Sequence, residues 1–409
     1  MEDERSDEVI AAIKEKIIHK LEYQNDVDDE ELKTMIAEEL KEYSASEYLS
    51  IKQKMIVGKK VFHSMRKLDI LQDYLEDSSV TEIMINGPDA IFVEQKGRLY
   101  KSGEHFESEE SLRNVIQQIV AKCNRVVNEA SPIVDARLSD GSRVNVVLNP
   151  IAINGPILTI RRFPQTPYLM EDLVGIESLT EEVAHFLKNL VIAGYNIIVS
   201  GGTGSGKTTF LNALSAYIPC DERIITIEDS AELQIQGIDN LVRLETRNAN
   251  VEGCRAISIR DLIKTSLRMR PSRIIVGEVR GAEAMDMICA AMNCGHDGSM
   301  STVHANNASD TIGRLETMIM MAADLPVNAI RQQICSGVDI IVHLGRLRDK
   351  TRKVLEISEI IKASDYGAEM NVLYRFVENE LSSKDSVKGS LQKIGELKNV
   401  AKLQNAGLI

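Results

Sequence analysis

The segment that most limits what this chain can fold into is the glycine-rich run GGTGSGKT, residues 201–208. It follows the apolar run NIIVS at residues 196–200 and precedes a segment that carries Phe210, Leu211 and Leu214 at helical spacing. Glycines let the backbone curl so that consecutive N–H groups point inward at a helix N-terminus, where the helix dipole also favours an anion. The run therefore predicts a phosphate-binding loop between a buried strand and a helix.

The residue types of this loop suit a nucleoside triphosphate. Lys207 is expected to reach the β- and γ-phosphates, and the Thr208 hydroxyl is expected to bind Mg²⁺. A glycine-rich turn without a ligand is the alternative, and the strand-loop-helix context argues against it. The residues expected to hold the nucleotide are Gly202, Thr203, Gly204, Ser205, Gly206, Lys207, Thr208 and Thr209.

Two acidic residues and one histidine stand at the ends of strand-like runs and are candidate catalytic residues. Glu278 follows the apolar run RIIV, where a carboxylate can lie beside Mg²⁺ and orient the attacking water. We expect Glu278 to hold the metal through water. Glu228 ends the run IITIE, and a solvated strand-end carboxylate is the alternative for both residues. His304 ends the run GSMSTVH and is predicted either to contact a γ-phosphate or to be structural.

The pattern of the remaining chain predicts several domains, since 409 residues exceed what one hydrophobic core usually serves. Apolar residues at helical spacing predict a helical domain over residues 1–75, and short runs around turn signals predict an α+β domain over residues 76–164. A linker is predicted at residues 165–175, beside Pro164 and Pro167. Strands alternating with helices predict an α/β domain over residues 176–378, with a mostly parallel sheet covered on both faces. Residues 379–409 are predicted to be a polar tail.

Charge and cysteine usage exclude some classes of protein. The net charge is −13, and residues 1–50 alone hold 16 acidic and 6 basic side chains. Nucleic acid is therefore an unlikely partner, because binding to its backbone needs basic surface. The acidic residues 1–50 are expected to form either a solvated helical surface or a docking surface for a basic partner. The six cysteines form no C-x-x-C pair, and no run approaches the length of a membrane span, so we expect a cytoplasmic protein that meets the membrane through partners.

The order of four motifs resembles the type II/type IV secretion ATPase superfamily. They are GGTGSGKTT, ITIEDSAEL, RIIVGEVRG and GHDGSMSTVHAN. Within it, the amino-terminal helices, VTEIMINGPDAIFVEQKGRL, GSRVN and PILTIRRF are similar to the CpaF-like ATPases of Tad (Flp) pilus systems. The similarity spans roughly residues 50–376. It implies a RecA-like P-loop motor domain preceded by an α+β domain, PAS-like in this family, and an N-terminal helical domain.

The resemblance also implies partners and further site residues. It implies a homohexamer that binds ATP and Mg²⁺ between the amino-terminal and motor domains, and that acts on inner-membrane pilus platform proteins. By position, Arg143 in GSRVN and Arg161 in LTIRRF match the family's γ-phosphate arginines, with Arg162 in reserve. It also favours a functional His304. The tetracysteine zinc module of some relatives is missing from this sequence, so no structural zinc is expected.

Other functions remain open at this stage. The chain could belong to a conjugation or effector-export machine of the same superfamily. It could also be a RecA-like nucleic-acid motor, although its acidic charge argues against this function. A nucleotide-binding scaffold without turnover is a further alternative, and the presence of Lys207, Thr208 and Glu278 argues against it.

Overall fold

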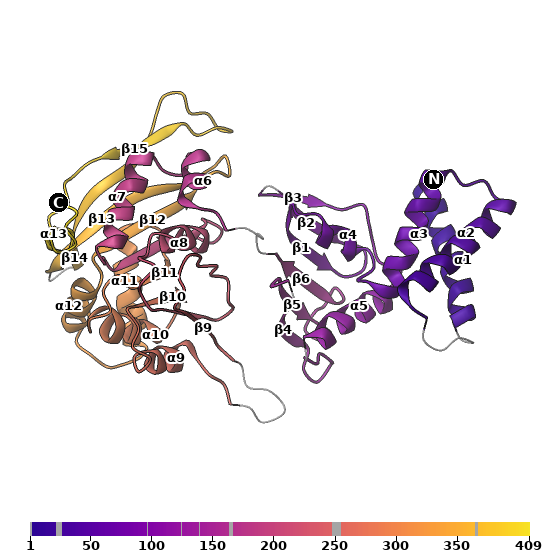
Figure 1. The fold of residues 1–409 in the computed structure, drawn as a ribbon, viewed down its shortest axis with the longest axis horizontal. Coiled ribbons are helices and arrows are strands. Elements are labelled where there is room, and N and C mark those ends of the chain that lie inside the picture. Colours follow the sequence, from indigo (N-terminus) through magenta and orange to yellow (C-terminus); the bar gives the residue numbers. More distant parts are fainter. Residues whose placement is uncertain are drawn as a thin grey trace. The chain divides into compact units, whose positions relative to one another are not determined.

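The computed structural model describes residues 2–21, 27–95, 97–123, 125–138, 140–162, 167–247, 255–364 and 367–409 (Figure 1). The chain forms two compact units, Met1–Pro164 and Gln165–Ile409. Each unit is described by itself. Residues 165 and 166 of the predicted linker, and Pro164 beside it, lie outside the described residues.

The first unit begins with three packed helices. They are α1 (Glu2–Leu21), α2 (Asp29–Ser46) and α3 (Ile51–Arg66). The Asp28 side chain accepts hydrogen bonds from the N–H groups of Glu30 and Glu31, and Ser50 caps α3 in a similar way, so both helix starts are fixed locally. Apolar residues at helical spacing, among them Ile13, Ile17 and Leu32, form a core of their own between the helices.

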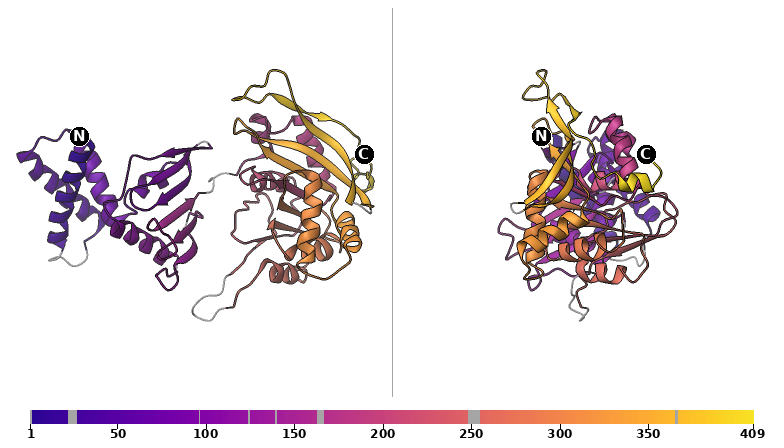
Figure 2. Two further views of the ribbon diagram at one scale, coloured as in Figure 1. Left: turned by 180° about the vertical axis from the view of Figure 1, so that it is seen from behind. Right: turned by 90° about the vertical axis from the view of Figure 1, so that its left-hand side faces the viewer.

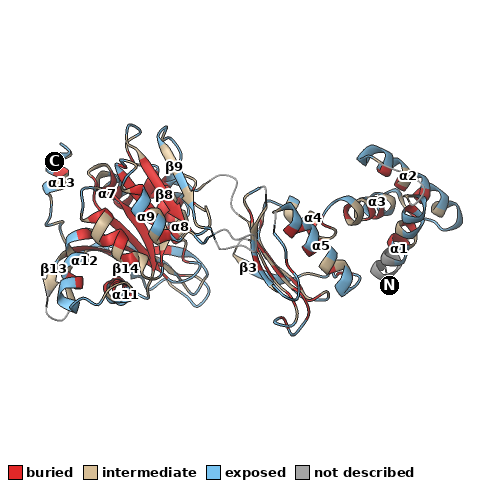
Figure 3. Ribbon diagram, turned by 90° about the horizontal axis from the view of Figure 1, so that it is seen from below, coloured by how far each residue is buried: buried red, intermediate tan, exposed pale blue. Residues whose placement is uncertain are grey.

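An antiparallel sheet and two helices complete the first unit. The described strands pair in the order β3-β2-β1-β6-β5-β4, and every pair is antiparallel. Helices α4 and α5 lie on one face of this sheet (Figure 3). The elements are α4 (Leu71–Glu76), β1 (Val80–Asn86), β2 (Ile91–Gln95), β3 (Arg98–Lys101), α5 (Glu109–Lys122), β4 (Ile133–Arg137), β5 (Arg143–Val147) and β6 (Ile157–Arg161).

Side chains along these strands alternate between a buried face and an open face of the sheet. Ile83, Val144 and Ile160 are buried and pack in one core with apolar residues of α5. Their neighbours Arg143 and Arg161 therefore point to the opposite face of the sheet. The first unit thus presents polar side chains on the face that no helix of the unit covers.

The second unit is built on a larger sheet with the described strand order β15-β14-β13-β12-β7-β11-β10-β8-β9. The strands from β12 to β9 are parallel, and β13, β14 and β15 extend the sheet in antiparallel fashion. The strands are β7 (Ile197–Gly201), β8 (Ile224–Glu228), β9 (Leu241–Glu245), β10 (Arg273–Val279), β11 (Met300–His304), β12 (Ile340–Arg346), β13 (Arg352–Ser364), β14 (Gly367–Glu378) and β15 (Gly389–Lys393).

Helices cover both faces of this sheet, and Figure 2 shows the orange helices of one face from behind. Ile197 and Val199 pack toward α7 and α8, whereas Ile198 packs toward α11 and α12 in a second core. The helices are α6 (Met170–Gly175), α7 (Glu181–Ile192), α8 (Lys207–Ser215), α9 (Ile259–Ser266), α10 (Glu283–Met285), α11 (Ala308–Met320), α12 (Val327–Gly337) and α13 (Ala401–Asn405), with a π-helical turn η1 (Asp286–Met292). The second unit is therefore an α/β fold with a mostly parallel sheet covered on both faces, as the sequence predicts, and it is preceded by an α+β part and a helical part.

Two segments are more ordered than the sequence suggests. Residues 170–175, expected in a linker, form α6, whose Met170 and Leu173 are buried in the core of the second unit. Residues past Glu378, expected as a polar tail, add β15 to the sheet and end in α13. Both segments therefore pack as parts of the second unit.

The end of the chain is anchored beside the start of β7. The Tyr195 hydroxyl donates to the carbonyl of Asn399 at 2.5 Å. Lys402 Nζ lies 2.8 Å from both Asp297 Oδ1 and Asp339 Oδ2. Among the residues that the structure describes, no helix is both long and apolar enough to span a membrane.

Candidate active site

The predicted site residues of the second unit meet at one edge of its sheet. Parallel strands end at the same edge, and β7, β8, β10 and β11 end here in Gly201, Glu228, Val279 and His304. Gly201 lies opposite His304 in the pairing of β7 with β11. Side chains that are far apart in sequence are thereby placed around the glycine-rich loop.

The loop has the backbone that its glycines predict. Gly204 and Gly206 have φ of 70° and 92°, left-handed values that favour glycine. Gly206 precedes the first residue of α8, so the loop leads directly into a helix N-terminus. Ser205 is buried and donates to the carbonyl of Gly202 at 2.9 Å, which fixes the curl. The N-terminus of a helix placed behind a curled loop suits phosphate.

Lys207 and His304 are in contact at the loop. Lys207 is 7% exposed, and its Nζ donates to the carbonyls of Gly201 and Gly202 at 3.2 and 3.0 Å. The same Nζ lies 3.5 Å from His304 Nδ1 and 3.4 Å from Nε2. His304 Nε2 lies 2.8 Å from Glu278 Oε1, so three of the predicted residues form one chain of polar contacts.

The surroundings of His304 favour a neutral ring. Burial lowers the pKa of His304, Glu278 raises it, and the positive charge of Lys207 lowers it further, so that its pKa is below the ordinary value. The neutral ring thus stands between the ammonium group of Lys207 and the carboxylate of Glu278.

Glu278 is also held from its other side. Arg280 Nη2 donates to Glu278 Oε2 at 2.6 Å, and Arg280 Nη1 lies 4.0 Å from Asp229 Oδ2. The pairing of β10 with β11 shifts register between Val276 and Val279, an irregularity that re-aims the side chains within it. Glu278 is therefore oriented by two cationic or polar neighbours.

Glu228 lies in a different environment. It is 3% exposed, and its Oε1 accepts hydrogen bonds from the N–H groups of Glu232 and Leu233, both at 2.8 Å. Within the described part of the chain, no group donates to Oε2. Burial raises the pKa of Glu228 to about 7, although the two N–H groups lower it. A Cβ on Gly277 would come within 3.0 Å of Glu228 Cγ, so the glycine makes room for this carboxyl group.

The donor set fits a triphosphate with Mg²⁺. Oxygen ligands suit Mg²⁺, and the half-buried Thr208, Glu278 and the unpaired Oε2 of Glu228 offer a hydroxyl and carboxylates at one sheet edge. Among the described residues, the cluster with metal-ligand spacing is His63, Asp73 and Glu76 in the first unit. Lys59 already lies 2.6 Å from Asp73 and 3.7 Å from Glu76 there, which reduces the negative charge available to a cation.

The predicted arginines lie in the first unit, on the open face of its sheet. Arg143 and Arg161 are directly opposite each other on β5 and β6. Arg161 also lies opposite Glu82 on β1, and Arg143 lies opposite Arg137 on β4. Arg161 is exposed and Arg143 is half-buried. The sheet thus gathers three guanidinium groups and one carboxylate in a row across four strands.

The reserve residue Arg162 has a structural environment. Its Nη1 donates to the carbonyls of Val80 at 3.2 Å and Tyr74 at 3.4 Å, and also to the carbonyl of Asp77. These acceptors belong to the end of α4 and the turn into β1. Arg162 therefore stabilises that turn.

Two further arginines lie against the glycine-rich loop and were not predicted from the sequence. Arg352 Nε donates to the carbonyl of Gly204 at 2.8 Å. Arg346 Nη1 lies 3.9 Å from the place of a Cβ on Gly204. The basic run GRLRDKTRK at residues 345–353 was the available signal, but a charged turn between two strands is usually only solvated.

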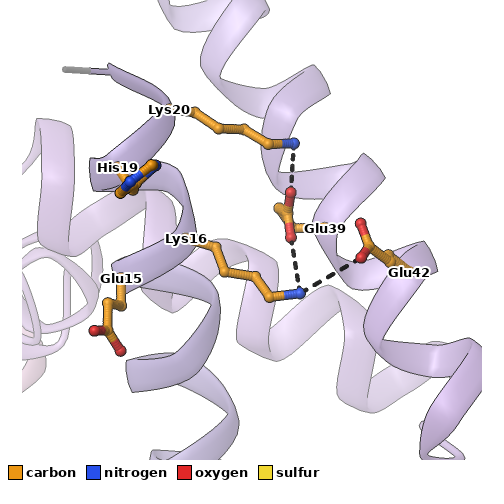
Figure 4. A pocket seen from close by; sticks show the side chains of 6 residues that line it. All are labelled: Glu15, Lys16, His19, Lys20, Glu39 and Glu42. Carbon is orange, nitrogen blue, oxygen red and sulfur yellow. Dashed lines mark ion pairs between the residues drawn. The ribbon is translucent and has the colours of Figure 1, made fainter. Parts of the chain in front are cut away.

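A pocket in the helical part of the first unit is charged but internally compensated (Figure 4). Glu39 is 2% exposed; it pairs with Lys20 and lies 3.4 Å from Lys16, which also lies 3.7 Å from Glu42. The lysines hold the pKa of Glu39 below its usual value, the hydrogen bond from Lys20 being the largest cause. This cluster joins α1 to α2 and leaves little charge for a ligand.

Comparison with known proteins adds a family to this geometry. A family model described as "Type II/IV secretion system protein" matches residues 65–396. The chain is 34% identical over 300 residues to the "Putative conjugal transfer protein Rv3659c" of Mycobacterium tuberculosis, covering 72% of this chain and 84% of that protein. It is 32% identical over 316 residues to the "Type IV secretion system protein PtlH" of Bordetella pertussis, covering 71% and 93%.

The fold has a counterpart among solved structures. The crystal structure of the pilus retraction motor PilT with bound ADP aligns with a TM-score of 0.51 and 18% sequence identity, over 83% of this chain and 87% of that chain. At this identity the likeness concerns the fold alone.

Proposed function

This chain belongs to the type II/IV secretion system protein family, and from that premise we propose that it is an ATPase that couples hydrolysis of ATP to mechanical work. ATP is held by Gly202, Thr203, Gly204, Ser205, Gly206, Lys207, Thr208 and Thr209. Thr208, and Glu278 through water, would hold Mg²⁺, which would neutralise charge at the phosphates.

The observation that carries this proposal is the chain of contacts from Lys207 through His304 to Glu278. Lys207 binds the phosphates, and Glu278, fixed by Arg280 and His304, orients the attacking water. His304 links the lysine to the carboxylate, so that the position of one affects the other. Because its pKa is about 7, Glu228 is close to half ionised at neutral pH and is suited to accept a proton.

Arg143 and Arg161 are proposed to pair with the γ-phosphate. A guanidinium group offers a fixed fork of donors that neutralises charge developing on the transferred phosphoryl group. Both residues lie on the open face of the sheet, where Arg161 is exposed and Arg143 is half-buried, and this face is accessible to a ligand. Arg162 is not proposed for this role, because three backbone carbonyls already bind it.

At the level of the machine, we propose a homohexameric motor at the cytoplasmic face of the membrane that powers assembly, or assembly and retraction, of a Tad (Flp) pilus through platform proteins. Movement about the part of the predicted linker that precedes α6 would transmit the work. The resemblance of the amino-terminal segments to CpaF-like ATPases supports the pilus.

A second candidate is a motor for conjugation or type IV secretion. The named relatives favour it, because one is described as a putative conjugal transfer protein and another as a type IV secretion system protein. Both candidates share the ATPase site and differ in the machine that they drive.

The ATPase proposal is tested by two substitutions in the full-length protein. Glu278→Gln is expected to keep ATP binding and to lose Mg²⁺-dependent turnover, because the amide cannot orient water in the same way. Lys207→Ala is expected to weaken ATP binding itself. Phosphate release and nucleotide titration measure the two steps, and full turnover by Glu278→Gln would refute the assigned role.

The choice of machine is tested by crosslinking in native cells with Glu278→Gln. A motor stalled with bound ATP is expected to hold its partners longest. Recovery of polytopic pilus-platform proteins supports the pilus motor, whereas recovery of conjugation or effector-export components supports the second candidate. Lys207→Ala serves as the matched control that cannot be stalled with ATP.

A further inference from the structure

Helices α3 and α4 of the first unit are joined by a short turn that brings their side chains together. The carbonyl of His63, in the last turn of α3, accepts hydrogen bonds from the N–H groups of Lys67 and Asp69 at 3.0 and 3.1 Å. On α4, Asp73 and Glu76 are three residues apart and therefore lie on one face of the helix. The turn thus fixes His63 beside two carboxylates of the next helix.

The imidazole of His63 is buried without a hydrogen-bond partner in the described part of the chain. The residue is 7% exposed, and its Nδ1 lies 3.6 Å from Asp73 Oδ1, which is too long for a hydrogen bond. Burial lowers the pKa of the ring, although Asp73 opposes the shift, so the ring is neutral at neutral pH. Buried polar groups usually have a partner, and the nitrogen of a neutral imidazole is a common metal ligand. The fold therefore leaves a metal-binding nitrogen next to the two carboxylates.

Asp73 and Glu76 already converge on one positive charge. Lys59 Nζ lies 2.6 Å from Asp73 Oδ1 and 3.7 Å from Glu76 Oε2, so the ammonium group occupies a position where both carboxylates stabilise a cation. The Lys59 side chain is 53% exposed, and exposed ion pairs contribute little to stability. Its flexible stem can turn the ammonium group into solvent. Lys59 therefore competes with a metal ion but does not exclude it.

The three groups have the spacing of a metal site. One nitrogen of His63 and one oxygen each of Asp73 and Glu76 lie within 4.8 Å of one another. Two donor atoms bound to one Zn²⁺ lie at most about 4.2 Å apart, twice the usual bond length, so a small rotation of the exposed carboxylates would close the site. A cavity of about 190 Å³ is lined in part by His63 and Asp73. A water molecule takes up about 30 Å³, so there is room for water to complete the coordination of an ion.

We propose that His63, Asp73 and Glu76 bind a divalent transition-metal ion of the Zn²⁺ type, which takes the place of the Lys59 ammonium group. One imidazole and two carboxylates suit Zn²⁺, whereas Mg²⁺ and Ca²⁺ prefer oxygen ligands alone. The ion links the last turn of α3 to α4, which packs beside β1, and so fastens the helical part of the first unit to its α+β part. Because all three ligands belong to the first unit, the proposal does not depend on the proposed function.

The test is a titration of the full-length protein, stripped of metal with a chelator and free of nucleotide, with Zn²⁺ and with Mg²⁺. Calorimetry measures the affinity, and thermal unfolding measures the effect on stability. Zn²⁺ is expected to bind more tightly than Mg²⁺ and to raise the unfolding temperature of the first unit, because it binds the folded state. Equal affinities for the two ions would contradict a site that contains a nitrogen ligand.

Two substitutions remove ligands. His63→Gln and Glu76→Gln are each expected to weaken Zn²⁺ binding at least about tenfold, because even groups that only orient metal ligands contribute on this scale. Glu76 is exposed, so its substitution spares the fold and keeps the test decisive if His63→Gln is unstable. Wild-type affinity in Glu76→Gln would show that Zn²⁺ binds adventitiously and would overturn the inference.

Lys59→Gln gives a prediction of opposite sign. Removal of the competing ammonium group is expected to raise the Zn²⁺ affinity about threefold, the scale of an exposed ion pair. If the ion pair served the fold alone, the Zn²⁺ affinity would not change, and that result would also overturn the inference. His105→Gln is the matched control, since His105 is an exposed histidine of the same unit outside the cluster. Its Zn²⁺ affinity is expected to equal that of the wild type, and a loss as large as in His63→Gln would mark the binding as adventitious.

Discussion

Each of the two units of this protein carries a pair of arginines directly opposed on neighbouring antiparallel strands, and the two pairs differ in what surrounds them. Arg143 and Arg161 belong to a row that also contains Arg137 and ends in Glu82. Arg346 and Arg352 instead lie against the glycine-rich loop. The two arginine pairs therefore have different neighbours. A carboxylate, Glu82, lies beside the pair of the first unit, whereas the glycine-rich loop lies beside the pair of the second unit.

The largest expected effect is a loss of ATP turnover when the arginine pair of the first unit is changed. Arg143→Gln and Arg161→Gln are expected to lower turnover about 1000-fold, the scale of an arginine that neutralises transition-state charge. The affinity for ADP should stay near the wild-type value, because ADP has no γ-phosphate. Steady-state ATPase assays with ADP titrations measure both quantities. Turnover close to wild type in both variants would remove these residues from the site.

The second prediction compares Glu228 of the second unit with Glu82 of the first unit in their effect on the pH dependence of stability. The pKa of Glu228 is raised by burial from 4.5 to about 7. The folded state therefore binds more protons than the unfolded state, and the free energy of unfolding falls as the pH rises from 4.5 to 7. The expected loss is about 3 kcal/mol, and Glu228→Gln should abolish it.

Urea titrations that follow the unfolding transition of each unit between pH 4.5 and 8 measure this effect. Glu82→Gln is the matched change in the first unit, where burial also raises the pKa of the carboxyl group but Arg161 opposes the shift. Its effect on the pH dependence should be smaller. A Glu228→Gln protein with the same pH dependence as the wild type would contradict the prediction.

The smallest expected effect concerns stability at the hairpin between β12 and β13. Without nucleotide, Arg346→Gln and Arg352→Gln should change the free energy of unfolding by less than about 0.5 kcal/mol, because both side chains are exposed. Denaturant unfolding tests this. A loss of several kcal/mol would show that the pair serves the fold.

Much of the site could be predicted because its residues stand in contiguous motifs. The loop from Gly201 to Thr208 specifies its own backbone, and Glu228, Glu278 and His304 end strands whose apolar runs are plain in the sequence. Parallel strands then place those ends at one edge. The contacts among Lys207, His304 and Glu278 follow from that rule.

The rest depends on tertiary contacts that local patterns do not contain. Arg352 bonds to Gly204 across 148 residues, and nothing near either residue indicates the contact. Arg161 and Arg162 are adjacent in sequence, yet one lies on the open face of the sheet and the other binds backbone carbonyls. The edge strand β15 has mostly exposed side chains, so it lacks the alternation that identifies a strand.

The anchored end of the chain has a consequence for any shortened form of this protein. Lys402 forms an ion pair with Asp339, and burial raises the pKa of that carboxyl group. Leu403 is 7% exposed and packs in the core of the second unit. Cleavage after residue 400 would strand a buried charge and uncover apolar surface next to the start of β7. Although these residues are mostly polar, their contacts hold the start of β7 in place. A protease that removes them would therefore loosen the strand that leads into the glycine-rich loop.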